Sequence, residues 1–141
     1  MNAVQNEWVE KADEDYRVAL RELRVRRNPA FNAVCFHAQQ CAEKYLKAIL
    51  QQRGKPFFKT HDLDLLLTDC LEWFPLWEAM RSDLKRLARY AVLFRYPGES
   101  ADKQEAQRAV LAMRRCRQDV RIALGLPTPA SLRSRPPRKK R

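Results

Sequence analysis

The chain has 141 residues, 45% of them hydrophobic, which suits one globular domain with a single core. The formal net charge is +11, but six basic residues and no acids lie between residues 126 and 141, and without those six the charge is +5. No apolar run could span a bilayer and the N-terminus lacks the pattern of a secretory signal, so we expect a cytoplasmic protein that makes no use of a membrane.

Apolar residues at helical spacing predict a first helix from about Gln5 to Arg26. Its early half is acidic and its end is basic, an order that favours the helix dipole. Asn28 and Pro29 predict the cap and first residue of a second helix, which runs to about Arg53 and ends at Gly54.

Three further helices are predicted after this pair. A short third helix follows Thr60, which we expect to cap it, and Pro75 marks a break before the fourth. The fourth carries apolar residues from Leu76 to Val92 and should end near Pro97. Ser100 is the expected cap of a fifth helix.

These segments predict an all-α fold, a helical bundle of four main helices and one short helix with antiparallel up-and-down packing. Residues 1–125 form the expected domain. Residues 126–141 are rich in proline, arginine and lysine, cannot form a core, and are expected to be a disordered tail.

Four cysteines fall on the apolar faces of the predicted helices and form no C-x-x-C pair. They are therefore expected to be small buried hydrophobes in a reducing compartment. No set of His, Asp and Glu has metal-ligand spacing, and there is no Gly-rich phosphate loop, so neither a metal nor a cofactor is expected.

His37, Gln40 and Lys44 share one stripe of the second predicted helix, at positions i, i+3 and i+7. A histidine beside a lysine could bind a phosphate or transfer a proton. The alternative, which the residues alone favour, is a half-buried histidine that bonds to another helix, with the lysine extended beside it.

Arg95 and Tyr96 lie where the fourth helix meets a Pro-Gly turn. The arginine could bind a phosphate and the tyrosine could stack on a base, so both are candidate nucleotide-binding residues. The structural alternative pairs Arg95 with Glu99 or Glu43. His61 and Asp62 open the third helix, where a structural role is favoured.

The fifth predicted helix is rich in arginine. Its basic residues form either a solvated face or, with the tail, a surface that attracts nucleic acid. They are Arg108, Arg114, Arg115, Arg117 and Arg121.

Three motifs together resemble the HEPN domain (higher eukaryote and prokaryote nucleotide-binding). They are Phe36-His37-Ala38-Gln39-Gln40 with Glu43-Lys44, then Thr60-His61-Asp62-Leu63, and Arg95-Tyr96-Pro97. The resemblance implies a four- or five-helix bundle that commonly forms a homodimer. It also implies a minimal nucleotidyltransferase as partner, in a pair of the toxin–antitoxin type.

Several HEPN families are metal-independent ribonucleases, with an arginine followed four to six residues later by a histidine and the site assembled across a dimer. This chain departs from that motif, since its histidines are His37 and His61 and none follows Arg95. We therefore expect a module in which Arg95, Tyr96, His37 and Lys44 bind nucleotide or RNA phosphate. The alternatives are a divergent metal-independent ribonuclease using His37 and Arg95, and a non-catalytic interaction scaffold.

Overall fold

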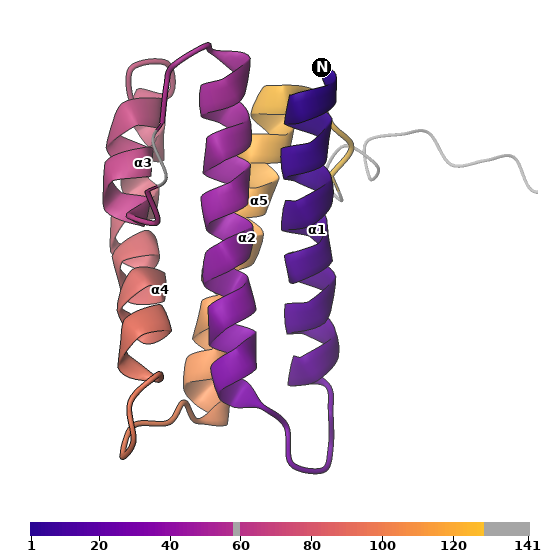
Figure 1. Ribbon diagram of the computed structural model, residues 1–141, viewed down its shortest axis with the longest axis vertical. Coiled ribbons are helices and arrows are strands. Elements are labelled where there is room, and N and C mark those ends of the chain that lie inside the picture. The colour runs from indigo at the N-terminus through magenta and orange to yellow at the C-terminus, as the bar shows by residue number, and fades with distance from the viewer. Residues whose placement is uncertain (58–59, 129–141) are drawn as a thin grey trace, which may run out of the picture.

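The computed structural model describes residues 1–57 and 60–128, and its regular elements in these ranges are all helical (Figure 1). The elements are α1 (Ala3–Leu23), α2 (Phe31–Gln52), α3 (Leu63–Cys70), the 3-10 helix η1 (Pro75–Met80), α4 (Arg81–Leu93) and α5 (Lys103–Leu124). α1 and α2 run side by side in opposite directions, α3 and α4 follow each other on the far side of α2, and α5 crosses behind it. The predicted all-α bundle is confirmed.

α2 lies at the centre of the bundle and contacts α1, α3, α4 and α5. Thirteen of its 22 residues are buried, in contrast to the one apolar face of an ordinary surface helix. Its largest fully buried side chains are Tyr45, Leu46, Ile49 and Leu50. The core therefore forms where α1, α3, α4 and α5 pack against this helix.

The start of α2 differs from the prediction. Asn28 has a positive φ of 49° and belongs to the turn, so it cannot cap the helix. α2 begins at Phe31, and its cap residue Ala30 offers no side-chain oxygen. The Ala30 N–H instead donates to Glu22 Oε1 at 2.7 Å, which ties the turn back to α1.

Two other predicted caps lie two residues too early. Asp62, not Thr60, caps α3 by accepting bonds from two backbone N–H groups. Asp102, not Ser100, caps α5 in a capping box with Glu105. A carboxylate near the first turn also interacts favourably with the helix dipole, which explains why aspartate fills both positions.

The fourth predicted helix is shorter than expected at both ends. Leu76 lies in η1 and is 89% exposed, so it does not belong to the core face. α4 ends at Leu93, before Pro97, and the chain then turns through Gly98 at φ 90°. The residue before a proline disfavours helical geometry, which stops the helix early.

The four cysteines are buried and unpaired, as expected. Burial raises the pKa of the Cys35 and Cys70 thiols to about 12. These thiols are therefore protonated near neutral pH and poorly nucleophilic.

The end of the chain's described part packs against the bundle. Gly125 ends α5 in a left-handed conformation, and Arg121 Nε donates to the Pro127 carbonyl at 2.7 Å. Thr128 is only 2% exposed. The predicted disorder of the tail otherwise concerns residues 129–141, which lie outside the described residues. No helix in the described ranges is long and apolar enough to cross a membrane.

A half-buried polar cluster around Asp13 joins α1 to α2 and α5. The Tyr45 hydroxyl and Arg117 Nε both donate to Asp13 Oδ1, the second at 3.1 Å. Arg121 Nη1 lies 3.2 Å from Asp13 Oδ2 and 3.2 Å from the Tyr45 hydroxyl. Burial and the bond to Asp13 raise the pKa of Tyr45, so its hydroxyl remains a donor.

The Asp13 cluster also shows what some of the arginines of α5 contact. Arg117 and Arg121 point into the molecule at Asp13, and Arg115 Nη1 lies 3.5 Å from Asp83 Oδ2. Two of the five arginines are thus engaged within the bundle and a third forms an ion pair on the surface, so the surface charge of α5 is smaller than the sequence suggests.

We expect Asp13→Ala to lower the free energy of unfolding by about 2–4 kcal/mol, because it leaves two arginines and a buried hydroxyl without their shared acceptor. The matched control is Glu14→Ala, an exposed neighbour outside the cluster, for which a change within about 0.5 kcal/mol is expected. Urea denaturation of both variants measures the difference. Equal stability of the two would show that the cluster contributes nothing.

Candidate functional site

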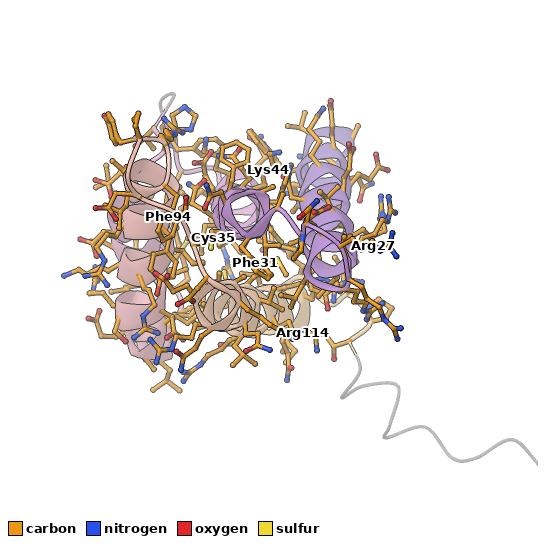
Figure 2. The ribbon with its side chains drawn as sticks, turned by 90° about the horizontal axis from the view of Figure 1, so that it is seen from below. Arg27, Phe31, Cys35, Lys44, Phe94 and Arg114 are labelled. Atoms are coloured by element: carbon orange, nitrogen blue, oxygen red, sulfur yellow. The ribbon has the colours of Figure 1, made fainter. Side chains whose placement is uncertain are left out.

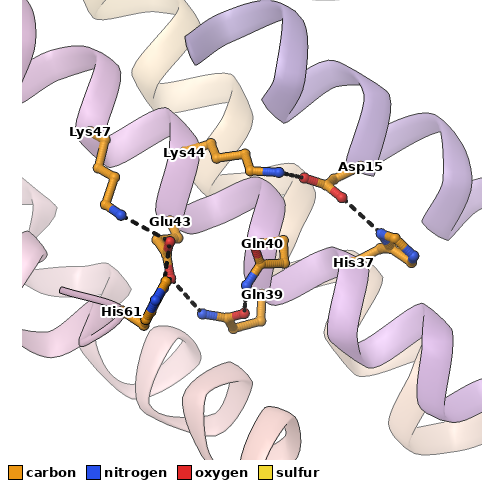
Figure 3. Close-up of polar contacts among 8 residues, drawn as sticks. All are labelled: Asp15, His37, Gln39, Gln40, Glu43, Lys44, Lys47 and His61. Carbon is orange, nitrogen blue, oxygen red and sulfur yellow. Dashed lines mark hydrogen bonds and ion pairs between the residues drawn. The ribbon is translucent and has the colours of Figure 1, made fainter. Parts of the chain in front are cut away.

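His37 and Lys44 are held by one carboxylate of α1. His37 Nδ1 lies 2.7 Å from Asp15 Oδ1, and Lys44 Nζ lies 2.5 Å from Asp15 Oδ2 (Figure 3). Asp15 is 7% exposed and therefore needs such partners. Both candidate residues thus connect α2 to α1, in the arrangement that the structural alternative describes.

A second polar chain runs along another side of α2 (Figure 3). Gln40 Nε2 donates to Gln39 Oε1 at 2.8 Å, and Gln39 Nε2 donates to Glu43 Oε1 at 3.1 Å. Lys47 Nζ lies 3.0 Å from Glu43 Oε2. His61 Nδ1 lies 3.1 Å from both Glu43 oxygens.

The members of this second chain differ sharply in exposure. Glu43 is 2% exposed and Lys47 is 5% exposed, whereas the His61 side chain is 75% exposed. The buried pair is therefore a structural unit, and His61 covers it from the solvent side. If His61 is neutral, its Nδ1–H donates to Glu43 and its Nε2 remains an acceptor facing outward.

A groove of about 700 Å³ lies between α2 and α4, beside this chain. Arg95, Gln40 and His61 all line it. The remaining lining residues are Phe36, Gln39, Asp62, Ala88, Ala91 and Val92. The structure therefore brings Arg95 together with His61, and not with His37.

Arg95 and His61 sit at different levels of the groove. Arg95 also lines the adjoining hollow with Asn32 and Phe36, whereas His61 bonds to Glu43. Phe36 and Glu43 are seven residues apart, or about 10 Å along the helix. Arg95 and His61 thus lie toward different ends of the groove and do not meet at one point.

Arg95 is exposed and makes no ion pair with any described residue, so neither Glu99 nor Glu43 neutralises it. Tyr96 is 62% exposed and lies beside it in the turn, outside the residues that line the groove. Among the described residues, no group of three or more His, Cys, Asp or Glu side chains could hold a metal ion. The chemistry open to the groove is therefore anion binding at Arg95 and proton transfer at His61.

Sequence reasoning missed the role of Gln39 and Glu43. A signal was present, because Phe36, Gln39, Gln40 and Glu43 fall at i, i+3, i+4 and i+7 and so share a stripe. Two buried polar residues on that stripe needed partners from another element. Glu43 finds one partner on its own helix, Lys47, and one outside it, His61.

We expect Glu43→Ala to lower the free energy of unfolding by about 3–5 kcal/mol, because it leaves the buried Lys47 charge without its partner. Glu43→Leu combined with Lys47→Met should recover most of that loss. His61→Asn should change stability by less than about 1 kcal/mol, since the ring is largely exposed. Denaturant unfolding tests the set, and a large loss in His61→Asn would contradict the assignment.

Comparison with known proteins identifies the fold and the family of the chain. The chain is similar to the Thermus thermophilus protein TT1696, with a TM-score of 0.73 and 25% identity over 84% of this chain and 96% of that one. It shares the fold of ST0689, an archaeal HEPN homologue, with a TM-score of 0.67 and 22% identity over 85% and 97% of the two chains. No curated protein matched. The HEPN domain model matches residues 5–123, and the chain therefore belongs to the HEPN family.

Proposed function

We propose that this HEPN domain binds a nucleotide or an RNA phosphate in the groove between α2 and α4. The observation that carries the proposal is the state of Arg95, an exposed guanidinium that lines a groove and has no ion pair with any described residue. A guanidinium offers a planar set of donors that fits phosphate oxygens. The unpaired Arg95 guanidinium is thus suited to bind an anionic ligand.

The rest of the groove suits the other parts of a nucleotide. Phe36 is 38% exposed, and with Ala88, Ala91 and Val92 it gives the groove an apolar surface against which a base can lie. Gln40 uses one amide group on Gln39 and keeps its carbonyl oxygen for a ligand. The span of about 10 Å from Phe36 to Glu43 leaves room for phosphate at one end and a base beyond it.

Tyr96 lies next to Arg95 in the chain and is exposed, so in this proposal it approaches the phosphate from outside the groove. His37 and Lys44 keep the structural role that Asp15 gives them.

The proposal extends to partners. In this proposal the chain forms a homodimer and acts with a nucleotidyltransferase-type partner in a pair of the toxin–antitoxin type, as its resemblance to HEPN domains implies. Sedimentation velocity over a concentration series tests the homodimer, and co-purification after co-expression with a nucleotidyltransferase tests the partner.

We expect Arg95→Ala to weaken the binding of a fluorescent nucleoside diphosphate by about 10- to 100-fold, the loss that follows from removing a charge-assisted hydrogen bond. The control is Arg89→Ala, which removes an exposed arginine of α4 that does not line the groove. Fluorescence anisotropy measures both. Unchanged affinity in Arg95→Ala would contradict the proposal.

A second candidate function is metal-independent cleavage of RNA, and the pairing of His61 with Glu43 favours it. The carboxylate holds Nδ1, so Nε2 could take the proton of a ribose 2′-hydroxyl as that oxygen bonds to phosphorus, and return it to the departing 5′-oxygen. Arg95 would stabilise the charged phosphate oxygens. This candidate ranks second because Arg95 lies near Phe36 and His61 bonds to Glu43, about two turns further along α2, whereas both groups must reach one phosphate.

The test is incubation of the protein with total RNA in EDTA. If the candidate is correct, His61→Asn should slow cleavage by about 100-fold or more, and His37→Asn should not, because His37 bonds to Asp15 outside the groove. Intact RNA with the wild-type protein would exclude this function and leave the binding proposal standing.

A further inference from the structure

A second hollow, of about 640 Å³, lies at the end of the bundle where α1 meets α2. It is lined by three cationic side chains, Arg24, Arg26 and Lys103, which come from the end of α1, the turn after it and the start of α5. All three are exposed, and none forms an ion pair with a described residue. The hollow therefore gathers three free positive charges.

The neighbouring carboxylates are engaged elsewhere. Glu22 Oε1 accepts the Ala30 N–H at 2.7 Å. Asp102 and Glu105 accept backbone N–H groups in the capping box of α5, at 2.7 and 3.2 Å. Their charges reduce the local potential, but no carboxylate lies among the residues that line the hollow. Such a surface attracts an anion with several charges.

This hollow and the Arg95 groove lie at the same end of the molecule. The Ala101 N–H donates to Asn32 Oδ1 at 2.7 Å and so fixes the segment between α4 and α5 beside the first turn of α2. Phe31 lines the basic hollow, while Asn32 and Phe36 line the next hollow together with Arg95. Figure 2, which views this end, shows Phe31 between Phe94 on one side and Arg27 on the other.

The two sites are separate hollows with no lining residue in common. Along α2 the basic hollow reaches Phe31 and the Arg95 groove begins at Phe36, five residues or about 7.5 Å further along the helix axis. A ligand that occupies both therefore needs phosphates at more than one position. A strand whose backbone passes from Arg95 to Arg24 would place phosphates at both.

We infer that the hollow lined by Arg24, Arg26 and Lys103 is a second phosphate-binding site, and that the ligand is a single-stranded polynucleotide running from the Arg95 groove across this end of the bundle. The inference rests on the proposed function, since it extends the ligand of the same groove. A single strand is required because a base must leave its stack to lie on Phe36.

The test uses a fluorescent 12-nucleotide oligouridylate and the oligothymidylate of equal length. The triple variant Arg24→Gln, Arg26→Gln, Lys103→Gln should reduce the slope of log affinity against log salt by about 2, which is about 100-fold in affinity at 0.1 M salt. Its affinity for the fluorescent nucleoside diphosphate should not change. The matched control replaces Lys11, Arg17 and Lys85, three exposed and unpaired cations elsewhere, by glutamine.

Each outcome is informative. An unchanged slope in the Arg24 triple variant, or an equal loss in the control, would overturn the inference while leaving the proposed function intact. The inference would also be overturned, and the proposed function kept, if Arg95→Ala lost diphosphate binding while the wild-type protein bound no oligonucleotide. Tighter binding of oligouridylate than of oligothymidylate would identify RNA, and equal binding would identify any single strand. Unfolding temperatures within a few degrees of the wild type show that both triple variants are folded.

Discussion

The structure depends on the position of α2, a 22-residue helix surrounded by four other helices. A helix in that position has little surface open to water, so each charged residue that it buries must find a partner. Glu43 and Lys47 meet this constraint by pairing with each other across one turn, at 3.0 Å. A buried pair adds little net stability compared with apolar residues, but the loss of one member is costly because the other charge stays buried without a partner.

The same constraint explains why residues close in sequence have different roles. His37 and Lys44 face α1 and are held by the buried Asp15, whereas Gln39 and Glu43 face α3 and α4 and are completed by His61. Gln40 borders the groove although it shares a stripe with His37 in a simple helical wheel. Rigid pairing inside the bundle thus leaves few polar groups facing the groove, which are those able to meet a ligand.

Much of the fold could be predicted from the sequence, because residues close together in the chain determine the helical spacing of apolar residues, the end of a helix at Gly54 and the break at Pro75. The caps were less predictable, since Thr60 and Asp62 are both good cap residues and only the backbone geometry decides between them. The candidate site was harder still. Arg95 was identifiable from its turn, but whether His37 or His61 accompanies it depends on which side of α2 packs against α1, and that is a property of the whole bundle.

The arginines of this chain separate into two groups with different physical roles. Arg117 and Arg121 are held by Asp13, whose single negative charge they share. Arg24, Arg26 and Arg95 make no ion pair with a described residue and are solvated at one end of the bundle. Salt screens such exposed charges far more than buried ones. If phosphates bind at these arginines, as we propose, moderate salt should weaken that binding well before it disturbs the buried pairs that maintain the fold.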